Sequence, residues 1–311
     1  MTELQAEEEK KQARLGAIFG ALAYTSWGFF PLYFRTAAPA GPVELTAHRA
    51  VWAFFCLLGI MYFRRELRGF IGIFKRPKVA LCLAASTLFI IGNWTIFVYG
   101  VLTDRTRYTS LGYFINPLFS VFLGFVFLRE RLRPLQWLSV ALAFIGVAYK
   151  TVEAGVLPWI SLGLAGCFGM YGLIRKQINV TAPQGLGFET MLMLIPGIAY
   201  IAWGESTGRG TFMSEPLDHK FILFCAGFVT ITPLLFFGGA ARRLRLATLG
   251  FLQYIAPTIQ LWFAIVIFNE PFETVDRVCF SLIWIGLAIY SFDTWRSMRK
   301  EGKKLMEKRE S

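Results

Sequence analysis

Long apolar stretches recur along the whole chain and are separated by short polar segments. A helix that crosses about 30 Å of hydrocarbon at about 1.5 Å per residue needs about 20 mainly apolar residues. Ten stretches come close to this length, and we predict membrane-spanning helices at residues 15–34, 44–63, 79–101, 106–128, 134–151, 157–174, 187–203, 220–240, 246–268 and 275–294. The segments between them are too short for a separate soluble domain. The pattern therefore predicts an all-α polytopic membrane protein with ten transmembrane helices.

The amino-acid composition argues against a soluble enzyme. Charged residues make up 17% of the 311 residues, whereas typical soluble domains have about 25%, and the mean hydropathy is +0.51. The five cysteines lie in five different apolar stretches without a CxxC pair. We therefore expect neither a disulfide framework nor a zinc site, and no metal or cofactor.

The positive charge of the chain follows a topology pattern. The chain has 32 Lys and Arg, and 24 of them fall in the tails at residues 1–14 and 295–311 and in alternate links between the predicted spans. Because cytoplasmic loops are enriched in Lys and Arg, both termini are predicted to face the cytoplasm. No loop combines basic and aromatic residues in a binding stripe, so we expect no nucleic-acid partner. Residues 1–13 lack the pattern of a cleaved signal peptide, and the first span is expected to remain in the mature protein.

The chain also contains an internal repeat. A shift of 140 residues aligns three pairs with the same internal spacings of 13 and 16 residues, namely Pro117 with Pro257, Glu130 with Glu270 and Gly146 with Gly286. Five spans lie between the copies, and this odd number inverts the second copy in the membrane. We therefore predict two inverted five-helix repeats, residues 15–151 and 152–294. Inverted repeats are typical of secondary transporters, whose substrate sites lie near the midplane.

Prolines interrupt five of the predicted spans, at Pro31, Pro117, Pro196, Pro233 and Pro257. Each proline frees a backbone carbonyl that lipid cannot satisfy, so the affected stretch must face protein or a watery cavity. A simple kink is the alternative at each position. Polar groups precede two of the prolines, with Asn116 before Pro117 and Gln253 and Tyr254 before Pro257. We therefore predict functional helix breaks at Pro117 and Pro257.

The second span carries the least lipid-like group of side chains. Glu44, His48 and Trp52 follow one another at steps of four on one helix face, with Arg49 beside them. Insertion of an ionised side chain into the membrane costs at least ~2.5 kcal/mol of free energy on insertion scales. Such side chains therefore form pairs with one another or line a cavity. The alternatives are that Arg49 snorkels to the interface, that Glu44 compensates the helix dipole and that His48 is a packed structural residue.

Several motifs, in order over nearly the whole chain, resemble one transporter family. They are AYTSWGFFPLYF (23–34), ELTAHRAVW (44–52), LGYFINPL (111–118), LRERL (128–132), MYGLIRK (170–176) and GFLQYIAP (250–257). The chain resembles the drug/metabolite transporter superfamily and, within it, the EamA-type permeases of the RarD group. The resemblance implies ten helices as two inverted repeats, and export or exchange of small metabolites or drugs across a bacterial inner membrane.

Candidate site residues are the polar and aromatic side chains inside the spans. For substrate binding we predict His48, Arg49, Trp27, Asn93, Trp94, Tyr113, Asn116, Gln253 and Tyr254. For gating or proton coupling we predict Glu44, His48 and Glu189. Apolar pockets with few polar anchors suit small molecules of mixed polarity. An interfacial aromatic belt and helix–helix hydrogen bonds are the alternative for about half of the polar and aromatic residues inside the spans other than Glu44, His48, Arg49 and Glu189, and Glu130 and Glu270 are expected to be structural.

These observations favour a secondary active transporter or exchanger that works by alternating access. A fixed arginine favours an anionic or amphipathic solute. A membrane-embedded enzyme and a non-transporting receptor are the alternatives, but the predicted spans contain no GxSxG motif, and the chain has no P-loop and no signalling domain. The expected partners are the small-molecule substrate, the lipid bilayer and protons, and the protein is expected to be a monomer or a homodimer.

Overall fold

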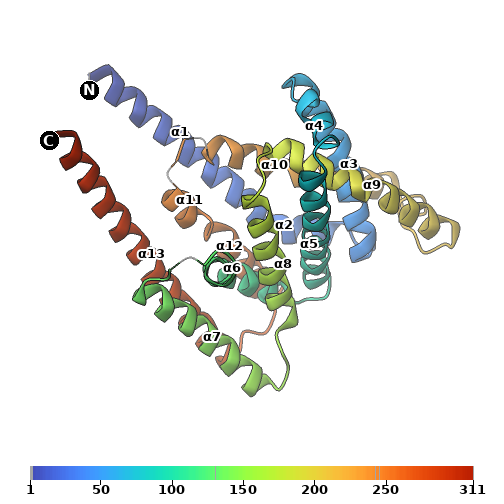
Figure 1. The fold of residues 1–311 in the computed structure, drawn as a ribbon. Helices are drawn as coiled ribbons and strands as arrows, with labels where there is room; N and C mark the ends of the chain where they lie inside the picture. The colour runs from blue at the N-terminus through green and yellow to red at the C-terminus, as the bar shows by residue number, and fades with distance from the viewer. Residues whose placement is uncertain (1–2, 130, 242, 245, 311) are drawn as a thin grey trace.

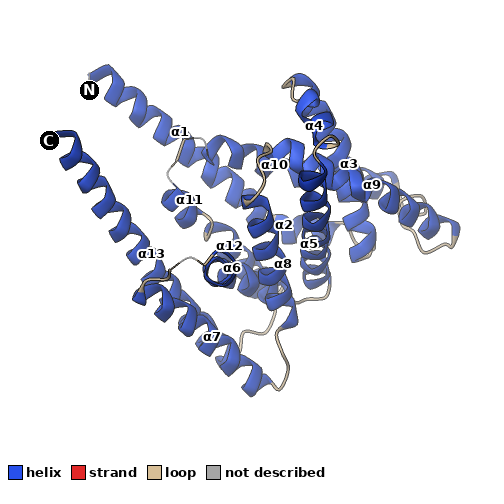
Figure 2. Ribbon diagram, in the orientation of Figure 1, coloured by secondary structure: helices blue, strands red, loops and turns tan. Residues whose placement is uncertain are grey.

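The computed structural model describes residues 3–129, 131–241, 243–244 and 246–310, and in this part of the chain it contains helices and no strands (Figure 2). Its elements are α1 (Glu3–Gly28), α2 (Phe30–Thr36), α3 (Pro42–Phe63), α4 (Leu67–Ile73), α5 (Pro77–Leu102), α6 (Thr106–Leu128), α7 (Pro134–Ala154), α8 (Trp159–Lys176), α9 (Ala182–Ser206), α10 (Leu217–Ala241), α11 (Leu246–Leu252), α12 (Ile255–Trp262), the π-helix η1 (Phe263–Ile267) and α13 (Thr274–Glu310). The all-α architecture predicted from the sequence is confirmed.

Eight helical segments among the described residues are long and apolar enough to cross a membrane. They correspond to eight of the ten predicted spans, and the chain is a polytopic membrane protein. The other two predicted spans differ in form. Residues 157–174 fall mainly on α8, which ends in the basic pair Arg175 and Lys176, and residues 246–268 are divided among α11, α12 and η1. The total of ten spans therefore stays a prediction.

The first predicted span is interrupted between α1 and α2 at Phe29. Pro31 lies two residues later and lacks the N–H that would bond the Trp27 carbonyl in a continuous helix. The amide Nε2 of Gln260, on α12, donates to that carbonyl at 3.1 Å. A side chain from a distant helix thus satisfies the backbone group that the proline frees.

The two prolines predicted to break helices behave differently. The interruption expected at Pro117 is not observed, because α6 continues from Thr106 to Leu128 with Pro117 inside it. A single missing donor is tolerated where neighbouring helices cover the position. In the second copy of the repeat, the helix is interrupted at Gln253 and Tyr254, between α11 and α12 and just before Pro257. Glu130 lies outside the described residues.

Helices distant in sequence pack in pairs (Figure 1). The most extensive contacts join α7 with α13, α3 with α9, α6 with α8, α5 with α8, and α10 with both α1 and α3. In Figure 1 the free ends of α1 and α13 extend toward the same side of the molecule, so the two termini lie near one another in that view.

Two glycines permit the close crossing of α7 and α13. A Cβ added at Gly146 would lie 3.2 Å from the carbonyl oxygen of Cys279, and a Cβ added at Gly286 would lie 2.9 Å from that of Ser139. The contact is reciprocal, because residues 139 and 146 of α7 meet residues 286 and 279 of α13. Both pairs are related by the same shift of 140 residues as the sequence repeat.

Glu270 connects the segment between η1 and α13 with the beginning of α6. Its carboxylate oxygens accept hydrogen bonds from the backbone N–H groups of Thr106 and Arg107, at 2.7 and 2.8 Å. A carboxylate at this position satisfies donors that have no partner within the helix and compensates the dipole of α6. Glu270 therefore has a capping role in the structure.

Candidate functional site

Arg49 lies on α3 and points into the helix bundle. Its side chain is only 2% exposed, and its Nε donates to Oγ1 of Thr230 on α10 at 3.1 Å. Its Nη1 is buried and has no hydrogen-bond partner among the described residues. The guanidinium therefore retains an unused donor in the interior, where unsatisfied polar groups are costly.

Aromatic rings surround the Arg49 guanidinium. Its central carbon lies 4.6 Å from the ring centroids of both Phe34 and Trp94 and 5.8 Å from that of Phe30. No carboxylate of the described residues lies within 4.0 Å of it. Ring faces therefore offset part of the positive charge, and no carboxylate of the described residues neutralises it at close range.

Short helix segments bring these rings together. Phe30 and Phe34 are one turn apart on α2 and therefore share a face, and this face packs on α5 through Phe97, whose ring centroid lies 5.8 Å from that of Phe34. The break at Phe29 allows α2 to present this face independently of α1. The proline of the first span thus contributes to the construction of the Arg49 site.

Asn93 and Tyr113 extend the same aromatic cluster. The hydroxyl of Tyr113 donates to Oδ1 of Asn93 at 3.2 Å, and Nδ2 of Asn93 donates to the carbonyl of Leu164 on α8 at 3.3 Å. The Tyr113 ring packs edge-on against Phe97 at 5.6 Å. Four predicted site residues, Arg49, Trp94, Asn93 and Tyr113, therefore lie in one continuous cluster formed by α2, α3, α5 and α6.

His48 faces other neighbours than Arg49, because consecutive helix residues point about 100° apart. Its Nδ1 accepts a hydrogen bond from the indole N–H of Trp52 at 3.2 Å, and its ring lies 4.8 Å from that of Phe212. Its Nε2 is buried without a hydrogen-bond partner in the described part of the chain. The structure thus separates His48 from the aromatic cluster around Arg49.

Glu44 is engaged by the segment between α9 and α10. Its Oε1 accepts hydrogen bonds from the backbone N–H of Thr211 at 2.7 Å and from the Thr211 hydroxyl at 3.0 Å. The same hydroxyl lies 2.9 Å from Nε2 of His219. Glu44 therefore holds this segment against the beginning of α3.

The Trp27 and Tyr254 rings are not among those that cover the Arg49 guanidinium, although Trp27 packs against the hydrophobic cluster that contains Phe34 and Phe97. The Trp27 ring packs on Tyr24 and Phe237, with centroids 5.4 and 5.9 Å away. Tyr254 stacks on Phe114 at 6.3 Å, in a different hydrophobic cluster from Tyr113.

Asn116 and Gln253 are the two predicted polar residues that precede Pro117 and Pro257. Asn116 is half-buried, and its Oδ1 has no hydrogen-bond partner among the described residues. Gln253 is half-buried between α11 and α12. The contacts of the described residues do not join Tyr113, Asn116, Gln253 and Tyr254 into one group.

Glu189, on α9, is 0% exposed. Ser86 donates to its Oε1 at 2.5 Å, and the Tyr171 hydroxyl donates to its Oε2 at 3.2 Å. Nη1 of Arg175 lies 3.9 Å from Oε1. Glu189 thus forms a second buried polar group, between α5, α8 and α9.

Sequence reasoning missed three groups that contribute to these sites. It did not single out Thr230, whose hydroxyl accepts a hydrogen bond from Arg49. It counted Arg175 only as a topology signal, and it did not single out Gln260. A polar residue in an apolar stretch was the available signal for Thr230 and Gln260. Within the described residues, no group of three His, Cys, Asp or Glu could hold a metal ion.

Comparison with known proteins places these features in one family. Residues 14–151 match the EamA-like transporter family. An uncharacterized transporter of Pseudomonas aeruginosa is 44% identical over 92% of this chain and 96% of its own length. Protein RarD of Salmonella typhimurium is 40% identical over 94% of this chain and 100% of its own length.

A solved crystal structure is similar in fold, with a TM-score of 0.53 and 19% identity over 88% of this chain and 96% of that chain. The fold, the family match and the two full-length relatives agree with one another. The chain belongs to the EamA-like transporter family, as a RarD-like permease of the drug/metabolite transporter superfamily.

Proposed function

We propose that this protein is a secondary transporter or exchanger, and not an enzyme, that moves a small carboxylate-bearing solute across the bacterial inner membrane by alternating access. The observation that carries the proposal is the buried guanidinium of Arg49 with its unpartnered Nη1. A charged side chain inside a membrane protein is costly and is kept where it serves a substrate or ion pathway.

Arg49 has the chemistry of an anion ligand. A guanidinium presents several N–H donors in a planar fork that matches a carboxylate, and such charge-assisted hydrogen bonds are stronger than neutral ones. Its attraction for an anion grows as water is excluded from the site. Thr230 orients the fork through Nε, which leaves the unpartnered Nη1 as a donor for the solute.

The aromatic residues around Arg49 suit the apolar part of the same solute. Phe34, Trp94 and Tyr113 supply rings of the kind that line small-molecule sites, and Asn93 adds an amide beside them. We assign the substrate-contacting roles to Arg49, Trp94, Asn93 and Tyr113. Trp27, His48, Asn116, Gln253 and Tyr254 remain candidates for contacts in another conformation.

Reciprocal packing supports the proposal of two inverted halves. Under the predicted repeat, α3, α6 and α7 correspond to α9, α12 and α13, and each packs against its own counterpart. The crossing at Gly146 and Gly286 repeats the same residue pairs in both directions. Two equivalent halves that meet around a central site are the architecture through which secondary transporters alternate their access.

The proposed orientation puts both termini in the cytoplasm. The cation distribution supports it, and so does the position of both chain ends on one side of the molecule in Figure 1. The relatives in Pseudomonas aeruginosa and Salmonella typhimurium support a bacterial protein, and the inner membrane is part of the proposal because proteins of the bacterial outer membrane span it as β-barrels.

A stabilisation screen tests the anionic-substrate assignment. Purified protein is heated with a panel of small carboxylates and with the matched uncharged amides. A ligand at 100 times its Kd stabilises the folded protein by about 2.7 kcal/mol, so a bound carboxylate should raise Tm more than its amide does. Arg49→Gln should lose this preference, and Arg49→Lys should retain only part of it.

Arg209→Gln is the matched control, because Arg209 is an exposed arginine stacked on Trp203 at 5.4 Å. This variant should keep the carboxylate preference of the wild type. The assignment is contradicted if Arg49→Gln keeps the preference, or if no carboxylate of the panel stabilises the wild type more than its amide.

A further inference from the structure

We propose that Glu189 is the proton-exchange site of this transporter and that Arg175 competes with the proton for its carboxylate. The inference rests on the proposed transport function and adds the coupling ion and the residue that opposes it. The evidence is a buried carboxylate held by two hydroxyl donors, with a guanidinium close by that does not bond it.

The contact between Arg175 and Glu189 is only half formed. Nη1 of Arg175 lies 3.9 Å from Oε1 of Glu189, beyond hydrogen-bond distance. The same Nη1 is buried and has no hydrogen-bond partner among the described residues. The guanidinium therefore attracts the carboxylate without being fixed to it, and it can approach or withdraw.

Gly185 provides the space for this guanidinium. It lies one helical turn before Glu189 on the same face of α9, and a Cβ added there would overlap the Arg175 guanidinium. The Arg175 side chain consequently reaches from the last turn of α8 to the first turns of α9. An interaction that depends on charge thus connects two helices that are not among the extensively packed pairs.

The polar surroundings of Glu189 come from two elements. Arg175 and Tyr171 face the carboxylate from α8, and Ser86 faces it from α5. The elements α3 and α4 contribute Met61 and Phe70, which are buried beside Phe188. Among the described residues, Arg175 is the charged group that opposes protonation of Glu189.

Proton exchange would change the helix contacts as follows. A proton from water binds a carboxylate oxygen of Glu189 and neutralises it, so the attraction for Arg175 ends. The Arg175 guanidinium keeps its own proton and can turn outward, since it belongs to the last turn of α8. The proton leaves to water on the opposite side of the membrane when the site reopens there.

The helix α8 connects this event to the Arg49 cluster. Its Leu164 carbonyl accepts a hydrogen bond from Asn93, and Asn93 also holds the hydroxyl of Tyr113. The next residue, Trp94, covers the Arg49 guanidinium. A shift of α8 relative to α9 would therefore reach the proposed substrate contacts through two hydrogen bonds.

The first test needs no substrate. Infrared difference spectra of the purified protein are recorded as the pH is changed, and the C=O stretch of a protonated buried carboxyl group is followed. Glu189→Gln should remove one such band. Arg175→Met should move the midpoint of that band by about one pH unit or more toward higher pH, because an opposite charge at this distance favours the ionised form. A band that is unchanged in Glu189→Gln, or an unchanged midpoint in Arg175→Met, overturns the inference.

The second test uses proteoliposomes and the radiolabelled carboxylate that gives the largest stabilisation of the wild type. With the membrane potential clamped at zero and a gradient of one pH unit, one coupled proton sustains an accumulation of up to about tenfold. Glu189→Gln should accumulate no label but should still exchange it against internal unlabelled solute. Accumulation that persists in Glu189→Gln overturns the inference, whereas a wild type without any exchange overturns the proposed function instead.

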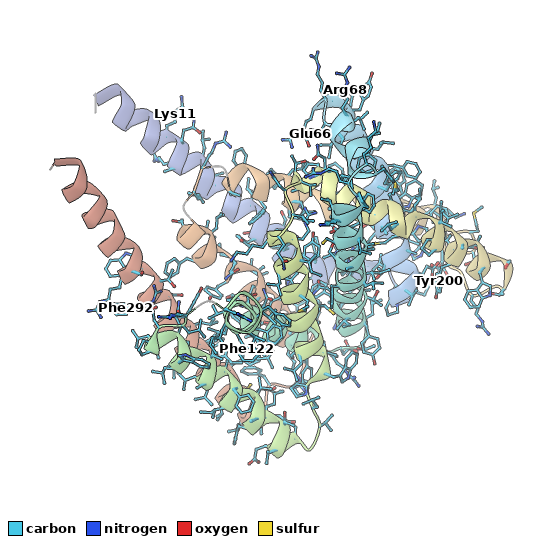
Figure 3. The ribbon with its side chains drawn as sticks, in the orientation of Figure 1. Lys11, Glu66, Arg68, Phe122, Tyr200 and Phe292 are labelled. Atoms are coloured by element: carbon cyan, nitrogen blue, oxygen red, sulfur yellow. The ribbon has the colours of Figure 1, made fainter. Side chains whose placement is uncertain are left out.

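Glu66→Gln is the matched control. Glu66 lies at the same end of the bundle, where it accepts a hydrogen bond from the Thr181 hydroxyl at the start of α9, and Figure 3 shows it at the opposite end of α9 from Tyr200. Its carboxylate is not in contact with Arg175 in the described structure. This variant should keep both the accumulation and the infrared band.

Discussion

Arg49→Met separates a functional role of Arg49 from a structural one. Replacing a buried residue that stabilises the fold lowers the free energy of unfolding. A buried charge that serves function lowers the stability of the native protein, so its replacement costs little stability. The contacts of Arg49 allow the net change to be worked out, because its partners are one hydroxyl and the faces of three rings.

The substitution removes and restores comparable free energies. It removes two close cation–π contacts of about 2 kcal/mol each when desolvated and a charge-assisted hydrogen bond of about 1.5 kcal/mol. It also removes two penalties that the wild type carries, namely several kcal/mol for the burial of a charge and about 1–3 kcal/mol for the unsatisfied donor. We therefore expect the free energy of unfolding to change by less than about 2 kcal/mol, while affinity for the carboxylate falls by about 30-fold or more.

Lys150→Met is the structural comparison. Lys150 is buried and forms an ion pair with Asp276, which also lies 3.5 Å from Nη1 of Arg107. Without the lysine, Asp276 keeps only the weaker contact with Arg107. Breaking a buried ion pair lowers the free energy of unfolding by about 3–5 kcal/mol.

Thermal unfolding of the purified variants, followed by intrinsic fluorescence, measures the difference. At about 2 °C per kcal/mol, Lys150→Met should lower Tm by about 6 °C or more and Arg49→Met by less than about 4 °C. The reasoning is refuted if Arg49→Met lowers Tm as much as Lys150→Met and each folded molecule still binds the carboxylate as the wild type does.

Three further predictions concern the architecture. Gly146→Ala and Gly286→Ala should each destabilise the protein by about 1–3 kcal/mol through overpacking of the same crossing, and thermal unfolding should give similar losses for both. A large loss in one alone would contradict the reciprocal contact. Gln260→Leu should cost about 1–3 kcal/mol because it leaves the Trp27 carbonyl without its side-chain donor, and an unchanged Tm would show that another group replaces it. A single cysteine introduced into residues 295–311 should be shielded from an impermeant thiol reagent in intact cells, and ready labelling from outside would contradict the cytoplasmic orientation.

Much of the fold follows from constraints that act along the sequence. Apolar length fixes the candidate spans because lipid offers no hydrogen bonds to an exposed backbone, and the segments so predicted coincide with helices. The interruption before Pro257 also follows from local chemistry, since proline removes a donor. At Pro117 the same local signal is misleading, because the packing of α6 against its neighbours keeps the helix continuous.

The sites were predictable only in part, because their partners come from distant helices. Arg49 stands out in the sequence as a charge inside an apolar stretch, but its ring neighbours on α2 and α5 depend on tertiary packing. Glu44 carries an equally visible signal, yet it is engaged by Thr211, which is 167 residues away. Arg175 was hidden by its position at a helix end, where a cation is expected for topology alone.

Counterflow in proteoliposomes tests the central claim most directly. Vesicles loaded with an unlabelled carboxylate that stabilises the wild type are diluted into the labelled compound, with empty vesicles and Arg209→Gln as references. The account predicts transient uptake of label by the wild type and by Arg209→Gln, reduced uptake by Arg49→Lys and none by Arg49→Met at equal amounts of folded protein. Uptake by Arg49→Met at the wild-type rate and affinity would contradict it.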